Sequence, residues 1–157
     1  MLPSEGEVAP DFEALYCDGE AFRRRALSET LTERGGVVVF FGFVFNAIGE
    51  NWWKRYKRAG WGDFDVPVLG VGRDGPYSMN EFIRQKDLPF GFFADVEGTV
   101  ADEYDLLVER DGMAGVRTAK RAVFVFNGDR EVQHRWTSDD WIHPVPREEI
   151  EGAVSDL

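Results

Sequence analysis

The sequence of 157 residues holds few side chains that could carry covalent chemistry. Cys17 is the only cysteine, so a two-cysteine redox cycle within one chain is excluded, although two Cys17 thiols could pair between chains. His134 and His143 are the only histidines, and no further ligands surround them, so we expect no metal site and no cofactor. The sequence also lacks a Ser-His-Asp set, a phosphate-binding loop and a dinucleotide fingerprint.

Cys17 is the first candidate for redox chemistry, and its neighbours do not favour that role. It ends an alternating segment and precedes Asp18-Gly19, a strong tight-turn signal. Asp18 and Glu20 should raise the pKa of the thiol, and no helix N-terminus is expected there to lower it. We therefore expect a half-buried structural residue, with a one-cysteine redox nucleophile as the alternative.

The stretch 37–53 must position any other site. It begins as an unbroken apolar run, which is typical of a strand buried on both faces. After the run, Asn46 is suited to cap a helix and Glu50 to lie in its first turn, where the helix dipole favours an acid. Open α/β sheets bind ligands at such places, beyond the carboxyl end of a strand.

The remaining segments alternate between strand and helix patterns, which predicts an α/β fold in one domain over residues 1–157. A hairpin is expected around Asp18-Gly19, followed by a solvated edge strand at 23–25. Helices are expected to start at Ser28, Ser78 and Pro146. Further strands are expected at 66–72, 121–126 and 131–136.

The charge balance narrows the classes of partner. A net charge of -11 and a pI of about 4.6 argue against binding to nucleic acid or an anionic membrane. Basic residues are mostly arginine, which together with the acidity favours a protein of a high-salt cytoplasm over a merely acidic one. No run is apolar enough to span a membrane, and we read no signal peptide at the N-terminus, so a cytoplasmic location is expected.

Residues 40–50, FFGFVFNAIGE, resemble the active-site loop of the peroxiredoxins, the alkyl hydroperoxide reductase and thiol-specific antioxidant group. In that family, a strand leads into Pro-x-x-x-Thr-x-x-Cys. Gly42 then takes the place of Pro, Asn46 of Thr and Gly49 of the peroxidatic Cys, while Arg121 falls on the family's active-site arginine. Similar matches continue from Gly6 to Val154, including Ala-Pro-Asp-Phe at 9–12.

The resemblance implies a thioredoxin-like central mixed sheet flanked by helices, with an N-terminal β-hairpin. It also implies an antioxidant-family protein without thiol peroxidase activity, because glycine at position 49 supplies no thiolate. On this interpretation the protein is a binding or scaffold pseudoenzyme for an unknown small molecule or protein. Its vestigial loop would hold Gly42, Asn46 and Gly49.

The pocket of this pseudoenzyme is expected at Phe45, Glu50, Arg121 and Trp136, with Arg121 ion-paired to Glu50. A homodimer through aromatic loops is also expected, although the same tryptophans could simply cover the sheet. These tryptophans are Trp52, Trp53 and Trp61. Two alternatives remain: a Cys17-dependent peroxide reductase, and an unrelated activity that uses Glu50 and Arg121 as an acid/base and anion-holding pair.

Overall fold

The apolar run forms the centre of the sheet in a computed structural model that describes residues 1–157. Its first half is strand β3, Gly36–Phe40, in which every residue is buried. β3 pairs in parallel with β4, Val68–Gly72, and antiparallel with β8, Arg121–Phe126. The prediction of a strand buried on both faces is therefore confirmed.

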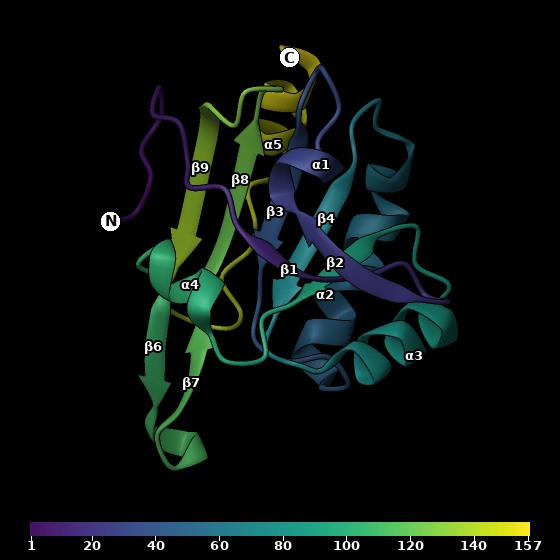
Figure 1. Cartoon of the computed structure of the whole chain (residues 1–157), viewed down its shortest axis with the longest axis vertical. Helices are drawn as coiled ribbons and strands as arrows, with labels where there is room; N and C mark the ends of the chain where they lie inside the picture. The colour runs from purple at the N-terminus through teal and green to yellow at the C-terminus, as the bar shows by residue number, and fades with distance from the viewer.

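Seven strands form one mixed sheet in the order β2-β1-β5-β4-β3-β8-β9 (Figure 1). β3, β4 and β5 run parallel, and every other neighbouring pair is antiparallel. The N-terminal hairpin pairs β1 with β2 through the turn at Asp18-Gly19. The α/β class and the hairpin were both expected from the sequence. The strands not yet given bounds are β1 (Glu13–Cys17), β2 (Phe22–Ala26), β5 (Gly91–Ala94) and β9 (Val132–Ser138).

Two apolar layers pack on the opposite faces of β3, because successive side chains of a strand point to opposite sides. Val37 and Val39 face a core shared with α2 (Ala47–Arg58), α3 (Pro76–Lys86) and α5 (Arg147–Ser155). Val38 and Phe40 face a second core, which includes residues of the short helices α1 (Leu27–Thr30) and α4 (Thr99–Glu103). The sheet is thus covered by helices on both faces.

Three helix starts differ from the prediction, and the smallest difference is at α5, which begins at Arg147 with Pro146 as its N-cap. Ser28 does not cap α1, which begins at Leu27 with Ala26 as the N-cap; its hydroxyl instead donates to Asp11 Oδ2 at 2.6 Å. α3 begins two residues before Ser78, because Pro76 has the backbone geometry of a first helical turn and Gly75 precedes it. The edge strand at 23–25 is confirmed as part of β2, where Arg24 and Glu13 form an exposed pair at 3.8 Å.

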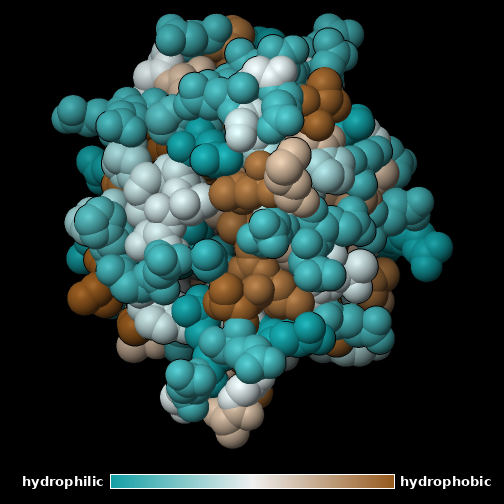
Figure 2. All heavy atoms as spheres, turned by 90° about the vertical axis from the view of Figure 1, so that its left-hand side faces the viewer, coloured by the Kyte–Doolittle hydropathy of each residue, from teal (hydrophilic) through white to brown (hydrophobic).

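A second, two-stranded sheet was not predicted. It pairs β6, Leu107–Arg110, with β7, Val116–Ala119, and extends away from the main sheet (Figure 1). Two one-turn 3-10 helices complete the chain, η1 at Trp61–Asp63 and η2 at Asp111–Met113. None of the helices combines the length and the apolar character that a membrane crossing needs. The face on the left of Figure 1 is mostly hydrophilic, with apolar residues gathered near its middle (Figure 2).

Candidate functional site: a buried arginine at the start of helix α2

A short loop, residues 41–46, connects the carboxyl end of β3 to the start of helix α2. Asn46 is its N-cap, and Asn46 Oδ1 accepts a hydrogen bond from the backbone N–H of Gly49 at 2.8 Å. The Asn46 amide also donates to the carbonyl of Phe43, which ties the loop to the helix. Phe45, just before the cap, has φ of 56°, so the chain turns sharply there. The predicted N-cap is confirmed.

Two glycines lie in this region, Gly42 in the loop and Gly49 in the first turn of α2, and other atoms pack closely against both. A Cβ atom on Gly49 would lie 3.0 Å from the carbonyl oxygen of Phe43 and 3.1 Å from Asn46 Nδ2. A Cβ atom on Gly42 would lie 2.9 Å from the ring of Trp141. The loop is therefore packed for glycine at both positions.

Arg121 is the first residue of β8 and is only 6% exposed. Its guanidinium carbon lies 4.4 Å from the centre of the Trp52 ring and 5.2 Å from that of Trp136. Nη1 donates to the carbonyl of His143 at 2.6 Å, while Nη2 is buried without a hydrogen-bond partner. This arrangement holds a cation between two aromatic rings with one donor unused.

No negative charge neutralises Arg121 at close range. None of the salt bridges in the structure includes it. Burial raises the pKa of the neighbouring Tyr56 to about 12, although Arg121 opposes this, so the phenol is neutral at pH 7. Burial likewise lowers the pKa of Arg121, but an arginine remains charged. The carboxylate that acts on it electrostatically is that of Asp140, which is exposed.

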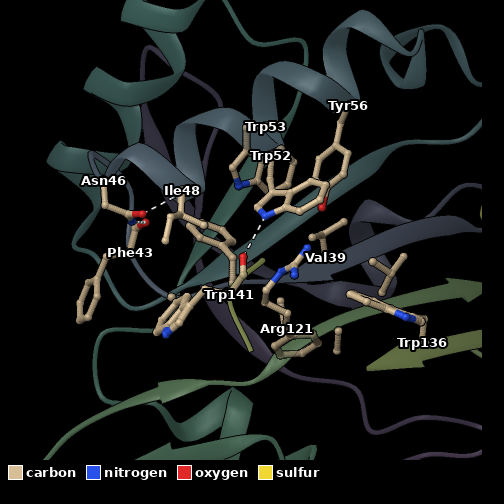
Figure 3. A pocket seen from close by; sticks show the side chains of 16 residues that line it. Val39, Phe43, Asn46, Ile48, Trp52, Trp53, Tyr56, Arg121, Trp136 and Trp141 are labelled. Atoms are coloured by element: carbon tan, nitrogen blue, oxygen red, sulfur yellow. Dashed lines mark hydrogen bonds between the residues drawn. The ribbon is translucent and has the colours of Figure 1, made fainter. Parts of the chain in front are cut away.

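These side chains line a narrow pocket with a cavity volume of about 30 Å³ (Figure 3). Twelve of its sixteen lining residues are hydrophobic, so Arg121 is the single charged group in an apolar wall. The walls come from β3 and the loop after it, the start of α2, β8, β9 and Trp141 in the loop before α5. Trp52 Nε1 donates to the carbonyl of Trp141 at 3.1 Å and holds that loop over the pocket.

The structure brings together only part of the predicted pocket. Arg121 and Trp136 line it, but Phe45 and Glu50 do not. Phe45 is 44% exposed and packs edge-on against Phe82 of α3, with ring centres 5.3 Å apart. The expected ion pair between Glu50 and Arg121 is wrong, because the first turn of α2 directs Glu50 towards α3. Glu50 instead pairs with Lys86 at 3.5 Å. The acid/base pair therefore has no geometric support.

Sequence reasoning missed Trp141 and the support that it receives from Trp52. Trp141 lies in a turn-rich stretch that carries no periodic signal, so its position depends on the tertiary fold alone. The predicted aromatic dimer surface also needs correction. Trp53 and Trp61 are 1% and 0% exposed and belong to the core, so they cover the sheet.

The sequence predicted a half-buried Cys17, but the structure buries it fully. It is 0% exposed in the core on the α2 side of the sheet, because β1 lies between β2 and β5. Burial, with a smaller contribution from Asp18, raises the pKa of the thiol to about 12. A thiol in this position is neither ionised at pH 7 nor accessible to peroxide, and this argues against the Cys17 alternative.

His134 lies between two glutamates on the far side of β9. Its Nδ1 is 3.6 Å from Glu5 Oε1, and its Nε2 is 3.5 Å from Glu149 Oε2. The three residues connect the N-terminal segment to α5, and no group of three or more potential metal ligands occurs in the structure. We therefore assign His134 a structural role, the contact with Glu5 and Glu149.

Comparison with known proteins shows which sequences this chain is similar to. The sequence model of the AhpC/TSA family matches residues 6–135. A putative peroxiredoxin bcp from Coxiella burnetii is 22% identical over 106 residues, which are 67% of this chain and 61% of the relative. A chloroplastic 2-Cys peroxiredoxin BAS1 from Spinacia oleracea is 22% identical over 142 residues, which are 85% of this chain and 52% of the relative. The chain thus spans between half and two thirds of the length of these relatives.

Solved structures agree on the fold. Peroxidoxin BcpB from Mycobacterium tuberculosis superimposes with a TM-score of 0.79 at 17% identity, covering 99% of this chain and 98% of that one. AhpC from Enterococcus faecalis gives a TM-score of 0.79 at 18% identity, covering 99% of this chain and 93% of that one. With the family match, the mixed sheet and the N-terminal hairpin, the chain belongs to the AhpC/TSA family of peroxiredoxins, with their thioredoxin-like fold.

Proposed function

We propose that this chain is a pseudoenzyme of the peroxiredoxin family, which binds a ligand or partner and does not reduce peroxide with a thiol. One observation carries the proposal: the first turn of α2, where the resemblance puts the peroxidatic cysteine, holds Gly49. Gly42 and Asn46 differ from the family pattern as well. Thiol peroxidase chemistry needs a thiolate at this point, and glycine has no side chain to supply one.

The closed packing of the loop supports the same proposal. Trp141 fills the space beside Gly42, and the loop carbonyl of Phe43 approaches Gly49. The pocket nevertheless retains a buried cation, Arg121, between aromatic rings. A pocket of this kind is suited to binding rather than to nucleophilic attack.

The test is peroxide consumption by the purified chain with a thiol reductant in high salt, with the intact mass read before and after. We expect no turnover above the reductant alone and no gain of oxygen. Turnover together with an oxygen added at Cys17 would overturn the proposal and restore the one-cysteine peroxide reductase. A Cys17→Ala variant provides the control for the assay.

We also propose a homodimer in a high-salt cytoplasm. The net charge of -11 supports the high-salt setting. The exposed apolar residues Phe45, Ile48 and Ile142 support the dimer. We also propose a single domain over residues 1–157. Light scattering in high and in low concentrations of potassium chloride tests the dimer. A monomer under both conditions would remove the dimer from the proposal.

A further inference from the structure

Arg121 carries an unused hydrogen-bond donor and lines a narrow apolar pocket. Its Nη2 is buried without a partner, and the residue is 6% exposed. Isolated buried charges are costly, and proteins normally pair them or satisfy their donors. Here the Trp52 and Trp136 rings offset part of that cost, but neither supplies a negative charge or accepts a conventional hydrogen bond.

The surroundings of Arg121 do not supply the missing anion. Tyr56 shares a side-chain hydrogen bond with Arg121, but it brings no negative charge, because burial raises the pKa of its phenol to about 12. Asp140 is exposed, and its oxygens accept hydrogen bonds from the backbone of Ile142 and His143. Asp139, its neighbour, pairs with Lys120 at 3.3 Å. The pocket therefore holds one positive charge that no carboxylate contacts, with exposed Asp140 acting on it only from a distance.

The size and polarity of the cavity limit what can occupy it. About 30 Å³ is room for one or two water molecules or for one ion of similar size. Larger organic acids would have to displace Trp141, which is held by its hydrogen bond from Trp52. An apolar wall gives little replacement for a hydration shell, so it disfavours strongly hydrated anions.

We propose that the pocket binds one small, weakly hydrated monovalent anion of the halide class, held by the Arg121 guanidinium beside the rings of Trp52 and Trp136. This rests on the proposed function in one respect, namely that the pocket is a binding site rather than a peroxidase centre. The ion completes the hydrogen bonding of Arg121 and neutralises its charge. It also makes the stability of the loop that carries Trp141 dependent on anion concentration.

The test is a titration of the intact chain with sodium bromide, balanced with sodium fluoride to a constant ionic strength. Bromide is a heavy atom that quenches tryptophan fluorescence, and Trp52 and Trp136 flank the site. In the wild type we expect a saturable quench in addition to the linear collisional one. Arg121→Met should lose the saturable part, with the apparent affinity reduced by about tenfold or more. Arg121→Gln is the second variant if the methionine protein does not fold.

Arg110→Met is the matched control, because it also removes one arginine that stacks on a tryptophan. The Arg110 guanidinium lies 4.3 Å from the Trp141 ring but outside the pocket. Its nitrogens already donate to Thr118 and to the carbonyls of Ala119 and Asp139. This variant should keep the saturable quench. If it loses the quench as Arg121→Met does, the saturable quench does not depend on Arg121 itself and the proposal fails.

Thermal unfolding gives an independent readout. Replacing fluoride by bromide should raise the Tm of the wild type relative to that of Arg121→Met, since a ligand bound only by the folded state stabilises it. A purely linear quench, or the same response in both proteins, would overturn the anion site and leave the loss of thiol chemistry untouched. Peroxide turnover with oxidation of Cys17 would instead overturn the proposed function and not the saturable quench.

Discussion

Trp52 Nε1 donates a hydrogen bond to the carbonyl oxygen of Trp141 at 3.1 Å, across 89 residues of sequence. The same Trp52 ring lies 4.4 Å from the guanidinium carbon of Arg121. One side chain of α2 therefore anchors the loop over the pocket and covers the buried cation. This relationship makes Trp52 the residue that links the first turns of α2 to the C-terminal part of the chain.

Replacing Trp52 by Phe tests that link. Phenylalanine retains an aromatic face for Arg121 but cannot donate to Trp141. We expect a loss of about 1 kcal/mol in the free energy of unfolding, because one partly buried hydrogen bond is removed. Hydrogen exchange should become faster in residues 139–146 and stay unchanged in β3. Equal acceleration in both segments would contradict a local anchor.

Asn46 should contribute to stability through its cap. Asn46→Ala removes the acceptor for Gly49 N–H and should cost about 1 kcal/mol in urea unfolding. Asn46→Asp keeps an acceptor and adds a negative charge at the positive end of the helix, so it should cost less. An aspartate variant as unstable as the alanine variant would show that the donation to Phe43, rather than the cap, is the important bond.

The thiol of Cys17 should be unreactive in the native state. It should react with a disulfide reagent only on unfolding, because the side chain is 0% exposed. The folded pKa of about 12 lies above the ordinary thiol value of 9.0, so the unfolded thiol ionises first as pH rises. The stability of the wild type relative to Cys17→Ala should therefore be constant below pH 9 and fall between pH 9 and 12. Urea unfolding on either side of pH 9 measures this difference, and a rise would contradict the assigned burial.

A cysteine introduced at position 49 should behave unlike Cys17. Gly49→Cys puts a thiol in the first turn of α2, where the helix dipole lowers the pKa of a thiol. Iodoacetamide should modify this variant at pH 7 and leave the wild type unmodified. Because the new Cβ atom lies 3.0 Å from the Phe43 carbonyl, we also expect a loss of about 1 kcal/mol in stability. Equal labelling of both proteins would contradict this contrast between a helix start and the core.

Periodicity and turn signals were enough for the main elements. The apolar run of 37–41, the Asp18-Gly19 turn and the Asn46 cap each depend on local physics, namely burial on both faces, tight-turn geometry and an unpaired N–H. Helix starts were less certain, because Pro76 and Ser78 both carry a start signal and only packing chooses between them. The strands β6 and β7 were not predicted, because their side chains are only partly buried and their alternation of apolar and polar residues is weak.

The site was predicted less well than the fold. The pocket does bring together four of the predicted residues, namely Gly42, Asn46, Gly49 and Arg121. The first three follow from the order of strand, loop and helix, and Arg121 lies beside them because β8 pairs with β3. The direction of a side chain on the first turn depends on the helix rotation, and this is why Glu50 went to Lys86 rather than to Arg121. Trp141 could not be assigned, since a loop residue is positioned by contacts distant in sequence.

The contact between Gly42 and Trp141 couples the residue types that the two positions can hold. A Cβ atom at position 42 would lie 2.9 Å from the Trp141 ring, so the ring must shift to admit any side chain there. A change at 42 alone overpacks the loop, and a change at 141 alone leaves a void. The two positions are therefore expected to change together or not at all. A residue with a side chain at position 42 is therefore best accommodated when position 141 is made smaller in the same variant, so the two positions form one unit of packing.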